Sequence, residues 1–503
     1  MMRSLFSGVS GLKSHQTKMD VIGNNISNVN TTGFKGSRVV FTDVFSQQLS
    51  GPSGPQGSIG GTNEKAVGLG TGVGAIDLLF TDGSVQSTGK NTDLALTGNG
   101  LFIVKQGNES YYTRNGDFYF DAEGNYVMSG SGMFVQGWTE QLNAEGKTID
   151  PTDVNMDKKV AAINSNGEPG IINIKAGKTM PPSKTTKADY IGNLDSGATS
   201  AITTTITVYD DQGFAYKIPI VFERAASVPS VTSTSGLGNK WIVGFPKTAS
   251  TTATSGGGAP STSGAFSTLT TSYTVKYNDR EVGTVTLDSL MTMVFNNDGS
   301  FNTVTSAEPA SATTAPATSA MPAFQLTFTV TNPPASIVST SATSGAAPAA
   351  PASSGGFSTT LDIDVDDLTQ YANESSLYGD TDGWASGVLK SVSFDKRGLI
   401  TGVYTNGVRQ YEGQVAVAQF TNASGLTKAG NSLYQASNNS GAANIKTATS
   451  LGVTITPSAL EMSNVDVATE FAEMITTQRG FQSNSKIVTV GDEMLETLIN
   501  MKR

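Results

Sequence analysis

Apolar residues recur every seven positions at both ends of the chain. In the first thirty residues this spacing is kept by Leu5, Leu12, Met19 and Ile26, with Val9, Ile22 and Val29 at intermediate positions. A repeat of seven places apolar side chains along one face of a helix. The sequence therefore predicts a helix over residues 4–28, ending in the Asn-rich stretch that follows.

The C-terminal stripe is longer. It consists of Leu460, Val467, Met474, Phe481, Val488 and Leu495, and it is widened by Phe471, Ile475, Leu498 and Ile499. Ser463, with Asp466 three positions later, is typical of a capped helix start. From there to Met501 the pattern spans about 37 residues, which as a helix is a rod of ~55 Å.

Each predicted helix needs a partner for its apolar face. Residues 1–35 carry a net charge of +3 and residues 458–503 a net charge of −3, which favours pairing of the two ends. Two alternatives follow: a helical hairpin within one chain, or stripes completed only by neighbouring copies. Gly8, Gly11 and Gly23 weaken the first helix by about 1 kcal/mol each relative to Ala, so we expect both helices to order fully only on lateral contact.

Between the helices the pattern changes to alternating apolar and polar residues. Four strand pairs are separated by Asp or Asn, two residues and Gly, at positions 121–124, 210–213, 296–299 and 395–398. This is the chemistry of a type I turn followed by a left-handed glycine. We therefore expect antiparallel sheets, and no strand–helix alternation suggests a parallel one.

Three tracts in the middle of the chain are made almost entirely of Ser, Thr, Ala, Gly and Pro. They span residues 248–270, 303–320 and 335–356. Such segments bury too little apolar surface to form a core. We expect solvated surface loops, with O-linked sugars as the weaker alternative.

Composition removes most classes of enzyme. The 503 residues include no Cys and one His, His15, which excludes disulfides, Cys-ligated metals and multi-histidine sites. The net charge of −10 does not favour nucleic acid or an anionic membrane as partner. No secretory signal and no apolar run of about 18 residues occurs, so we expect no membrane insertion and export without a cleaved leader.

Candidate chemistry is also weak. Residues 70–75, Gly-Thr-Gly-Val-Gly-Ala, match a dinucleotide fingerprint by letter, but an apolar strand follows instead of a helix. Adjacent carboxylates such as Asp366 and Asp367 would point to opposite faces of a strand. His15 is expected to be exposed or interfacial. We therefore predict no catalytic residue, no cofactor and no metal site.

Several motifs at both ends are more specific. They are residues 4–35 with the Asn-rich run 24–35, residues 80–89 (FTDGSVQSTG), 92–96, 98–104, 112–118 (YTRNGDF), 136–138, 425–434 (GLTKAGNSLY), 460–466 (LEMSNVD) and 478–482. Together they resemble, in order, the signatures of the bacterial flagellar rod and hook family. The likeness covers about residues 1–140 and 360–503, and the middle of about 200 residues favours a hook subunit over a rod subunit.

The resemblance implies a mixed, mainly β fold, with discontinuous antiparallel β domains between long terminal helices that form a coiled-coil inner layer. The implied domains are 1–30 with 464–503 (helical core), 31–75 with 436–463 (connecting segment), 76–195 with 361–435 (β domain) and 196–360 (one outer β domain, or two with one inserted in the other). The implied function is a subunit of a hollow, curved tube that acts as a universal joint. A distal rod protein and a secreted β-rich adhesin are the alternatives.

Subunit contacts are expected at the stripes and the Asn-rich turn. The predicted interface residues are Leu5, Leu12, Met19, Ile22, Asn24, Asn25, Ile26, Asn28, Val29, Gly33, Phe34, Val467, Phe471, Met474, Ile475, Phe481, Val488, Leu495 and Leu498. The resemblance implies further copies, the rod, the hook cap, the hook–filament junction proteins and the type III export apparatus as partners. It also implies an extracellular place in the flagellum. A cysteine–lysine cross-link of the kind found in some spirochaete hooks is excluded, because the chain has no Cys.

Overall fold

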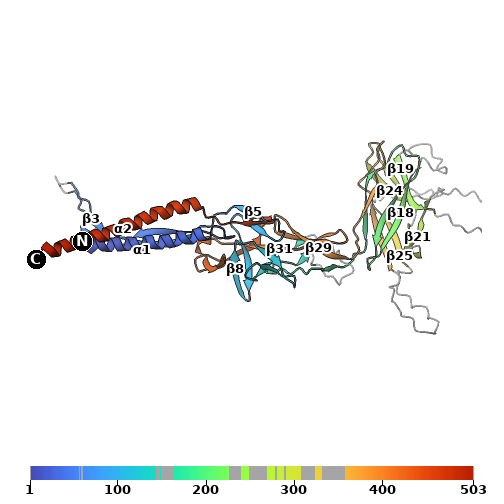
Figure 1. The fold of residues 1–503 in the computed structure, drawn as a ribbon. Helices are drawn as coiled ribbons and strands as arrows, with labels where there is room; N and C mark the ends of the chain where they lie inside the picture. The colour runs from blue at the N-terminus through green and yellow to red at the C-terminus, as the bar shows by residue number, and fades with distance from the viewer. Residues whose placement is uncertain are drawn as a thin grey trace, which may run out of the picture. The chain divides into compact units, whose positions relative to one another are not determined.

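The structure is a computed structural model, and it is mainly β with one long helix at each end, as the sequence predicts (Figure 1). It describes residues 2–55, 57, 60–142, 148, 162–225, 239–247, 269–277, 280–287, 290–306, 323–330 and 357–501. The chain forms two compact units. We call Met1–Lys178 with Leu389–Arg503 the terminal unit, and Thr179–Val388 the central unit.

The terminal helices α1 (Met2–Ser27) and α2 (Val467–Met501) pack antiparallel within the chain (Figure 1). Glycine residues lie at the contact between the two helices. A Cβ on Gly11 would lie 2.7 Å from Asn484 Nδ2, and one on Gly491 would lie 2.7 Å from Leu5 Cδ2. Close approach of the helix backbones therefore compensates part of the low helix propensity of glycine. Of the two alternatives, the in-chain hairpin is present.

The start of α2 differs from the prediction. Asp466, not Ser463, is the capping residue: Ala468 N donates to Asp466 Oδ1 (3.0 Å), and Thr469 Oγ1 donates to Asp466 Oδ2 (2.8 Å). The Ser463 hydroxyl instead accepts the N–H of Val465 (3.2 Å) in a tight turn before the helix. An apolar stripe fixes which face is buried, but the cap is fixed by which side chain reaches the free N–H groups.

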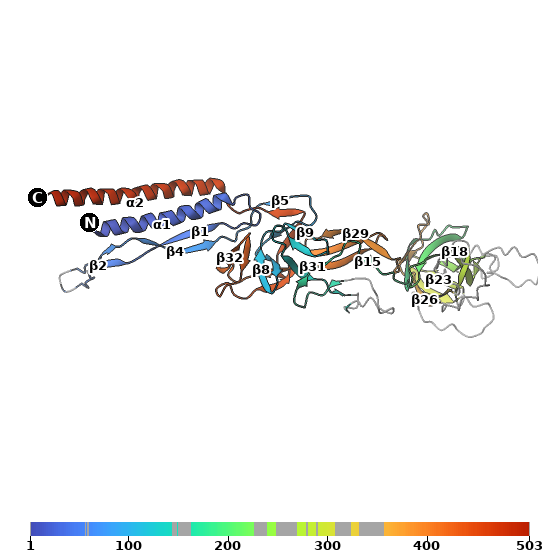
Figure 2. The ribbon, with the colours of Figure 1, turned by 60° about the horizontal axis from the view of Figure 1, so that its bottom comes forward.

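A two-stranded ribbon lies along α1 (Figure 2). Strand β1 (Ser37–Asp43) pairs antiparallel with β4 (Thr71–Leu78), and β2 (Ser46–Ser50) pairs with β3 (Lys65–Gly68). Ser14 Oγ donates to Thr71 O (3.3 Å), which ties the ribbon to the helix. The glycine-rich run 70–75 lies mostly in β4, so it is not a loop that opens a helix.

The rest of the terminal unit is a β domain. Its main sheet runs in the order β29 (Gly387–Phe394), β30 (Leu399–Tyr404), β31 (Arg409–Gln419), β11 (Phe134–Trp138), β7 (Leu101–Gln106), β8 (Glu109–Thr113), β33 (Leu433–Gln435) and β32 (Thr427–Gly430). Joined to it are β9 (Phe118–Phe120), β10 (Tyr126–Met128), β14 (Gly170–Ile171) and β34 (Asn444–Thr447). Two apolar clusters, around Phe102 and around Trp138, form its core.

Short strand pairs tie the chain just before α2 to this domain. They are β5 (Val85–Ser87) with β36 (Ala459–Glu461) and β6 (Leu94–Thr97) with β35 (Thr454–Pro457), both antiparallel. The remaining elements are β12 (Gln141–Leu142), β13 (Ala162–Ile163), and the 3₁₀ turns η3 (Ala423–Gly425) and η4 (Thr449–Leu451). The entry to α2 is therefore fixed by β pairing.

The central unit has two sheets that share one apolar core. One sheet runs β21 (Ser272–Tyr277), β22 (Arg280–Thr286), β25 (Ala323–Val330), β26 (Phe357–Asp364), β16 (Lys187–Asn193) and β27 (Leu368–Thr369), with β28 (Tyr378–Thr381) on β16. The other runs β17 (Ile202–Tyr209), β18 (Ala215–Arg224), β19 (Lys240–Pro246), β23 (Met291–Phe295) and β24 (Phe301–Ser306), with β20 (Leu269–Thr270) on β19. Strand β15 (Thr179–Met180) pairs with the start of β29.

The expectation of purely antiparallel sheets is wrong in one place. Strand β16 pairs parallel with both β26 and β27. These partners come after a long excursion through the rest of the central unit, and a long connection permits the parallel pairing that a hairpin cannot make. Turn chemistry predicts local hairpins only, so it gave no sign of this pairing.

All four predicted turns are confirmed. The glycine N–H donates to the carbonyl of the first turn residue in each, at 3.0–3.1 Å, and Gly124, Gly213, Gly299 and Gly398 have φ of +85°, +84°, +83° and +74°. Of the three small-residue tracts, residues 248–268, 307–320 and 335–356 lie outside the described residues. The ends of the first two are strand, because residues 269–270 form β20 and residues 303–306 belong to β24.

The division into units falls at Lys178/Thr179 and Val388/Leu389. Residues 179–195 and 361–388, which the sequence analysis groups with the inner β domain, make their contacts within the central unit. The central unit has one main core spanning both of its sheets. Leu389 N donates to Lys178 O (2.9 Å), so the two chain crossings leave the terminal unit side by side.

Candidate functional site

The predicted interface residues of the helices fall into two groups. One group is buried or half-buried: Leu5, Leu12, Met19, Ile22, Ile26, Val29, Val467, Met474, Phe481, Val488 and Leu495. The other group is exposed: Phe471, Ile475 and Leu498. Of the first group, Leu5 and Val488 contact the partner helix in the hairpin, whereas the second group lies on the surface of α2.

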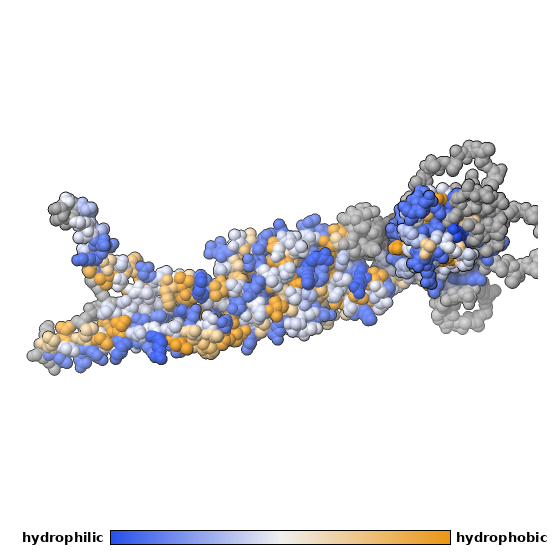
Figure 3. All heavy atoms as spheres, turned by 90° about the horizontal axis from the view of Figure 1, so that it is seen from above, coloured by the Kyte–Doolittle hydropathy of each residue, from blue (hydrophilic) through white to orange (hydrophobic). Residues whose placement is uncertain are grey.

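More exposed apolar residues were missed by the sequence analysis as interface candidates. On α1 they are Phe6 and Val9, on α2 Ile487, Val490, Met494, Ile499 and Met501, and on the ribbon Val40, Phe41, Val44, Phe45, Leu49, Val73 and Ile76. The residues of α2 have a signal of their own, because positions 487, 490, 494, 498 and 501 form a second apolar repeat beside the first. Figure 3 shows apolar side chains gathered along the part of the terminal unit that holds the helices.

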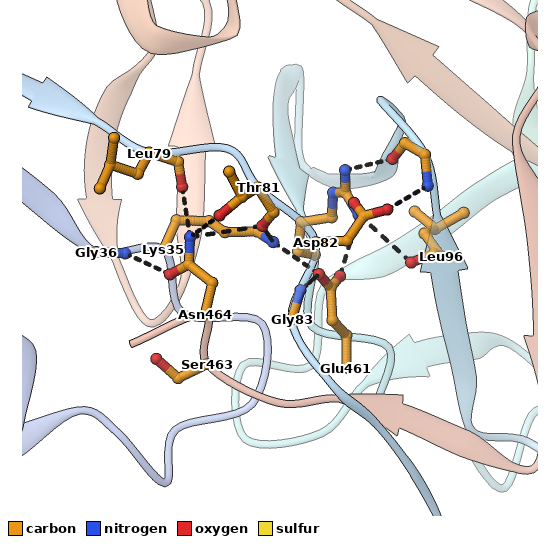
Figure 4. A network of polar contacts seen from close by, with 12 residues as sticks. Lys35, Gly36, Leu79, Thr81, Asp82, Gly83, Leu96, Glu461, Ser463 and Asn464 are labelled. Carbon is orange, nitrogen blue, oxygen red and sulfur yellow. Dashed lines mark hydrogen bonds and ion pairs between the residues drawn. The ribbon is translucent and has the colours of Figure 1, made fainter. Parts of the chain in front are cut away.

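The second feature is a buried network where both helices join the β domain (Figure 4). Lys35 and Glu461 are fully buried, and Lys35 Nζ lies 2.6 Å from Glu461 Oε1 and donates to Thr81 O at 2.6 Å. Gly83 N also donates to Glu461 Oε1 (2.9 Å). One carboxylate from the segment before α2 thus binds the segment after α1 and the loop before β5.

Arg114 brings the β domain into the same network. Its guanidinium is buried, with Nη1 3.1 Å from Glu461 Oε2 and 3.4 Å from Asp82 Oδ1. Nη2 donates to Gly98 O. Two cations and two carboxylates balance in charge, as buried ionic groups require. Burial lowers the pKa of Lys35, and the adjacent Glu461 carboxylate acts in the opposite direction.

Asparagine side chains complete the junction. Asn464 accepts from Gly36 N (2.9 Å) and donates to Leu79 O (2.8 Å). Asn25, buried on α1, exchanges two bonds with the backbone of Ser37 at 2.9 and 3.0 Å. These amides satisfy backbone groups where the helical pattern has stopped. Of the predicted Asn residues, Asn25 is therefore internal, while Asn24 is exposed.

Gly33 and Phe34, also predicted at a subunit interface, are buried inside the chain. Gly33 has φ of +65°, and a Cβ there would lie 2.3 Å from Asn115 N. Lys428 lies over the Phe34 ring at 4.9 Å and donates to Ser37 Oγ (3.0 Å). Burial lowers the pKa of Lys428. The family-like motifs of the sequence thus meet at this junction as parts of one fold.

His15 lies between the helices and the ribbon. Its ring meets Phe41 edge to face at 5.7 Å, and its Cε1 would lie 2.7 Å from a Cβ on Gly480. Burial, together with Lys18, lowers its pKa. Within the described ranges, no group of three or more His, Asp or Glu side chains is arranged to hold a metal ion.

Among the residues described, neither helix has a stretch long and apolar enough to span a membrane. The arrangement therefore has two distinct parts. The junction holds the segments of one chain together, and large apolar side chains are exposed on α1, α2 and the ribbon.

Four family models match successive parts of the chain. They are "Flagella basal body rod protein" (residues 5–35), "Flagellar hook protein FlgE/F/G D1 domain" (95–172), "Flagellar basal body protein FlaE D2 domain" (173–384) and "Flagellar basal body rod FlgEFG protein C-terminal" (456–501). The D2 match covers the middle of the chain, where the sequence motifs are least specific.

Full-length relatives agree with these models. The flagellar hook protein FlgE of Treponema pallidum is 36% identical, and that of Borreliella burgdorferi is 33% identical, each over 100% of both chains. The flagellar basal-body rod protein FlgG of Bacillus subtilis is 47% identical, but over 33% of this chain and 63% of its own. The rod protein matches only a third of this chain, whereas the two hook proteins match its full length. This chain therefore belongs to the flagellar hook protein family.

Proposed function

We propose that this structural subunit of the flagellar hook polymerises through the open apolar faces of its terminal unit, with α1 and α2 forming the inner layer of a hollow, curved tube. The observation that carries the proposal is the exposed apolar surface on both helices. Large apolar side chains grouped on a surface mark contacts with other molecules, and the net charges of the two ends, +3 and −3, suit contact between copies.

The predicted interface residues that remain open are the first candidates for these contacts. Phe471 is 50% exposed and Ile475 is 58% exposed, and they lie on the side of α2 away from α1. The buried members of the predicted set support the interface indirectly, because they hold the hairpin in shape. In this proposal, assembly covers the open faces and adds stability that the isolated hairpin lacks.

The junction at Glu461 fits the same role. A tube that transmits torque needs a rigid connection between its inner layer and the β domains. A charge-balanced, hydrogen-bonded network around a buried carboxylate favours one orientation of the groups it joins. We infer that bending is accommodated by the outer β domains, whose contacts would slide while the inner layer holds.

We further propose which proteins this chain contacts and how it leaves the cell. As a hook subunit the chain would contact the rod at one end of the tube and the cap and hook–filament junction proteins at the other. It would leave the cell through the flagellar type III apparatus without a cleaved leader, and its work would be mechanical, not catalytic. Absence of disulfides suits passage through a narrow channel as an unfolded chain.

Electron microscopy of the purified intact chain tests the central claim. We expect curved hollow tubes above a critical concentration, and limited proteolysis should cut the terminal helices of the dilute monomer faster than those of the polymer. Straight rigid tubes would favour the rod alternative. A chain that stays monomeric, with helices equally resistant at every concentration, would refute assembly through the helices.

A further inference from the structure

We propose that Asn166 is a site of spontaneous deamidation, at which the backbone nitrogen of Gly167 displaces ammonia from the asparagine side chain. The chain has four Asn-Gly pairs, at residues 99–100, 115–116, 166–167 and 406–407. By sequence all four are candidates for this reaction, but the fold leaves one pair open and holds the other three. Neither the reaction nor its test depends on the proposed function.

The reaction needs only water from the solvent. Gly167 N attacks Asn166 Cγ, and a new C–N bond forms as the Cγ–Nδ2 bond breaks. The amide nitrogen leaves as ammonia and takes the proton of the glycine N–H. Water then opens the five-membered succinimide at one of its two carbonyls, which gives aspartate or isoaspartate. Glycine favours ring closure, because without a Cβ its peptide reaches the required backbone conformation easily.

Asn166 and Gly167 are both exposed, on the loop between β13 and β14. Nothing lies within 4 Å of the place where a Cβ on Gly167 would be. The Asn166 N–H donates to Asn164 Oδ1 (3.2 Å). In the part of the chain that the structure describes, neither the Asn166 side-chain amide nor the Gly167 N–H makes a hydrogen bond. The attacking nitrogen and the amide that it attacks can therefore approach each other without breaking a contact.

Two of the other pairs are held by the asparagine side chain. Asn115 Oδ1 accepts the N–H of Asp117 at 3.1 Å. Asn406 Oδ1 accepts the N–H of Val408 at 3.1 Å, and the Gly407 N–H is itself hydrogen-bonded to a backbone carbonyl of the same turn. Ring closure at either pair would first have to break these bonds. Both asparagines should therefore react only when the local structure opens.

The fourth pair is held by its glycine. The Asn99 side chain is exposed, but Gly100 is buried and its N–H donates to Gly98 O at 2.9 Å. A Cβ on Gly100 would lie 2.7 Å from Val417 Cγ1, so the main chain is tightly packed there. Ring closure rotates the peptide between the two residues, and this packing opposes the rotation. Asn99 therefore shows whether an open asparagine is enough when its glycine is fixed.

Deamidation of Asn166 would act on a contact of the core. Gly167 O accepts the indole N–H of Trp138 at 2.7 Å, and Trp138 belongs to one of the two apolar clusters of the terminal unit. Isoaspartate lengthens the main chain by one methylene immediately before this glycine, which moves its carbonyl. Both products also add a negative charge to the loop, whose Asn164 already binds the Glu140 carboxylate at 2.8 Å. The reaction should therefore loosen the loop from the core.

Peptide mapping by mass spectrometry follows all four pairs at once. The intact chain is kept as a dilute monomer in mildly alkaline buffer, and samples taken over time are digested at acidic pH. We expect Asn166 to gain the mass difference between NH2 and OH at least about tenfold faster than the other three asparagines, because those react only after local opening. In urea the four rates should become similar. Gly167→Ala, which the open space around Gly167 accommodates, should slow the reaction at Asn166 alone.

An Asn166→Asp chain marks where the aspartate product elutes, so that isoaspartate is recognised as the second product of equal mass. A folded chain in which Asn99, Asn115 or Asn406 reacts as fast as Asn166 would overturn the inference. So would an Asn166 that reacts in urea but not in the folded chain. A preference for Asn166 that persists in urea would assign the reactivity to neighbouring sequence and would also overturn the structural argument.

Discussion

Glu461 accepts hydrogen bonds and ion pairs from three segments that are far apart in the sequence. Its two carboxylate oxygens bind Lys35, Gly83 and Arg114, and its own carbonyl accepts Gly33 N at 2.8 Å. Buried charge is tolerated there because every charged group has a partner of opposite sign. At the residue scale, Glu461 is therefore the side chain on which the ionic contacts between these segments converge.

The first prediction concerns that side chain. Glu461→Gln removes one of two negative charges and leaves Lys35 and Arg114 with Asp82 alone, so the free energy of unfolding should fall by about 3–5 kcal/mol. Urea unfolding of the monomer, followed by circular dichroism, measures the loss. The exposed pair Arg38–Asp77 is the control, and Arg38→Gln should cost at most about 1 kcal/mol. Equal effects of the two variants would contradict a structural role for the network.

The lowered pKa of His15 should make the stability of the helical hairpin depend on pH. Burial and Lys18 lower its pKa below the ordinary value of 6.5, so just below that pH the unfolded chain binds a proton that the folded hairpin excludes. The stability of the hairpin should therefore fall as pH drops from 7.5 to 5.5, and should recover as pH rises. Thermal unfolding across this range measures the slope.

His15→Gln is the matched variant for this measurement. Glu470, whose pKa burial raises, contributes a slope of opposite sign at lower pH, and it is common to both proteins. The difference between wild type and His15→Gln therefore isolates the histidine. A wild-type slope no steeper than that of the variant would show that the His15 ring is not sheltered between α1, α2 and the ribbon.

At the scale of elements, the helical hairpin combines residues of low helix propensity with close packing. Gly11 meets Asn484, Gly480 meets His15 and Gly491 meets Leu5. Glycine lowers intrinsic helix stability, yet each of these positions lets the partner side chain approach the backbone. Gly23 differs, because nothing lies within 4 Å of the place where its Cβ would be.

This contrast predicts opposite effects of the same substitution. Gly23→Ala should stabilise the monomer by about 0.4–1 kcal/mol, since it reduces the freedom of the unfolded chain without a clash. Gly480→Ala should destabilise it, because the His15 ring would have to move away from the helix. Melting temperatures of the two variants, compared at equal concentration, check the sign. Stabilisation by Gly480→Ala would mean that the helices are further apart than described.

How far the sequence predicts these elements depends on whether the signal is local. The four turns at 121–124, 210–213, 296–299 and 395–398 follow from Asp or Asn and Gly chemistry, and both helices follow from the seven-residue repeat. The parallel pairing of β16 with β26 joins residues more than 170 positions apart, and no local pattern encodes it. Burial of Lys35 is equally non-local, because it depends on Glu461 and Arg114 arriving from distant segments.

The candidate interface, too, could be predicted from the sequence only in part. An apolar stripe predicts that a face is buried but not which molecule buries it, so Val488 and Leu498 were grouped together although one packs in the hairpin and the other is exposed. The second repeat of α2, from Ile487 to Met501, could have been read from spacing alone. Which of the two repeats packs in the hairpin, however, depends on the register of α1, which the glycine contacts reveal and the sequence does not.

At the scale of the whole molecule, the two crossings between units make the central unit separable. Lys178 and Leu389 are hydrogen-bonded neighbours in the terminal unit, and Lys178 is held by the buried Glu412 carboxylate at 2.6 Å. The apolar cores of the two units consist of different residues. A short Gly-Ser linker can therefore replace residues 179–388 without stretching the strands that flank them.

The last prediction uses this deletion. If the helices carry assembly and the outer β domains carry bending, the deleted chain should still form tubes, because every residue of the hairpin, the ribbon and the Glu461 junction is retained. Those tubes should lose the curved, supercoiled form of the intact polymer, which electron microscopy of both would reveal. Adding Val490→Glu to the deleted chain should prevent tubes altogether, since that chain lacks every contact of the central unit and the variant places a charge among the exposed apolar residues of α2. Curved tubes from the deleted chain would place the source of curvature in the terminal unit, where contacts among helices and ribbon would have to switch between alternative packings.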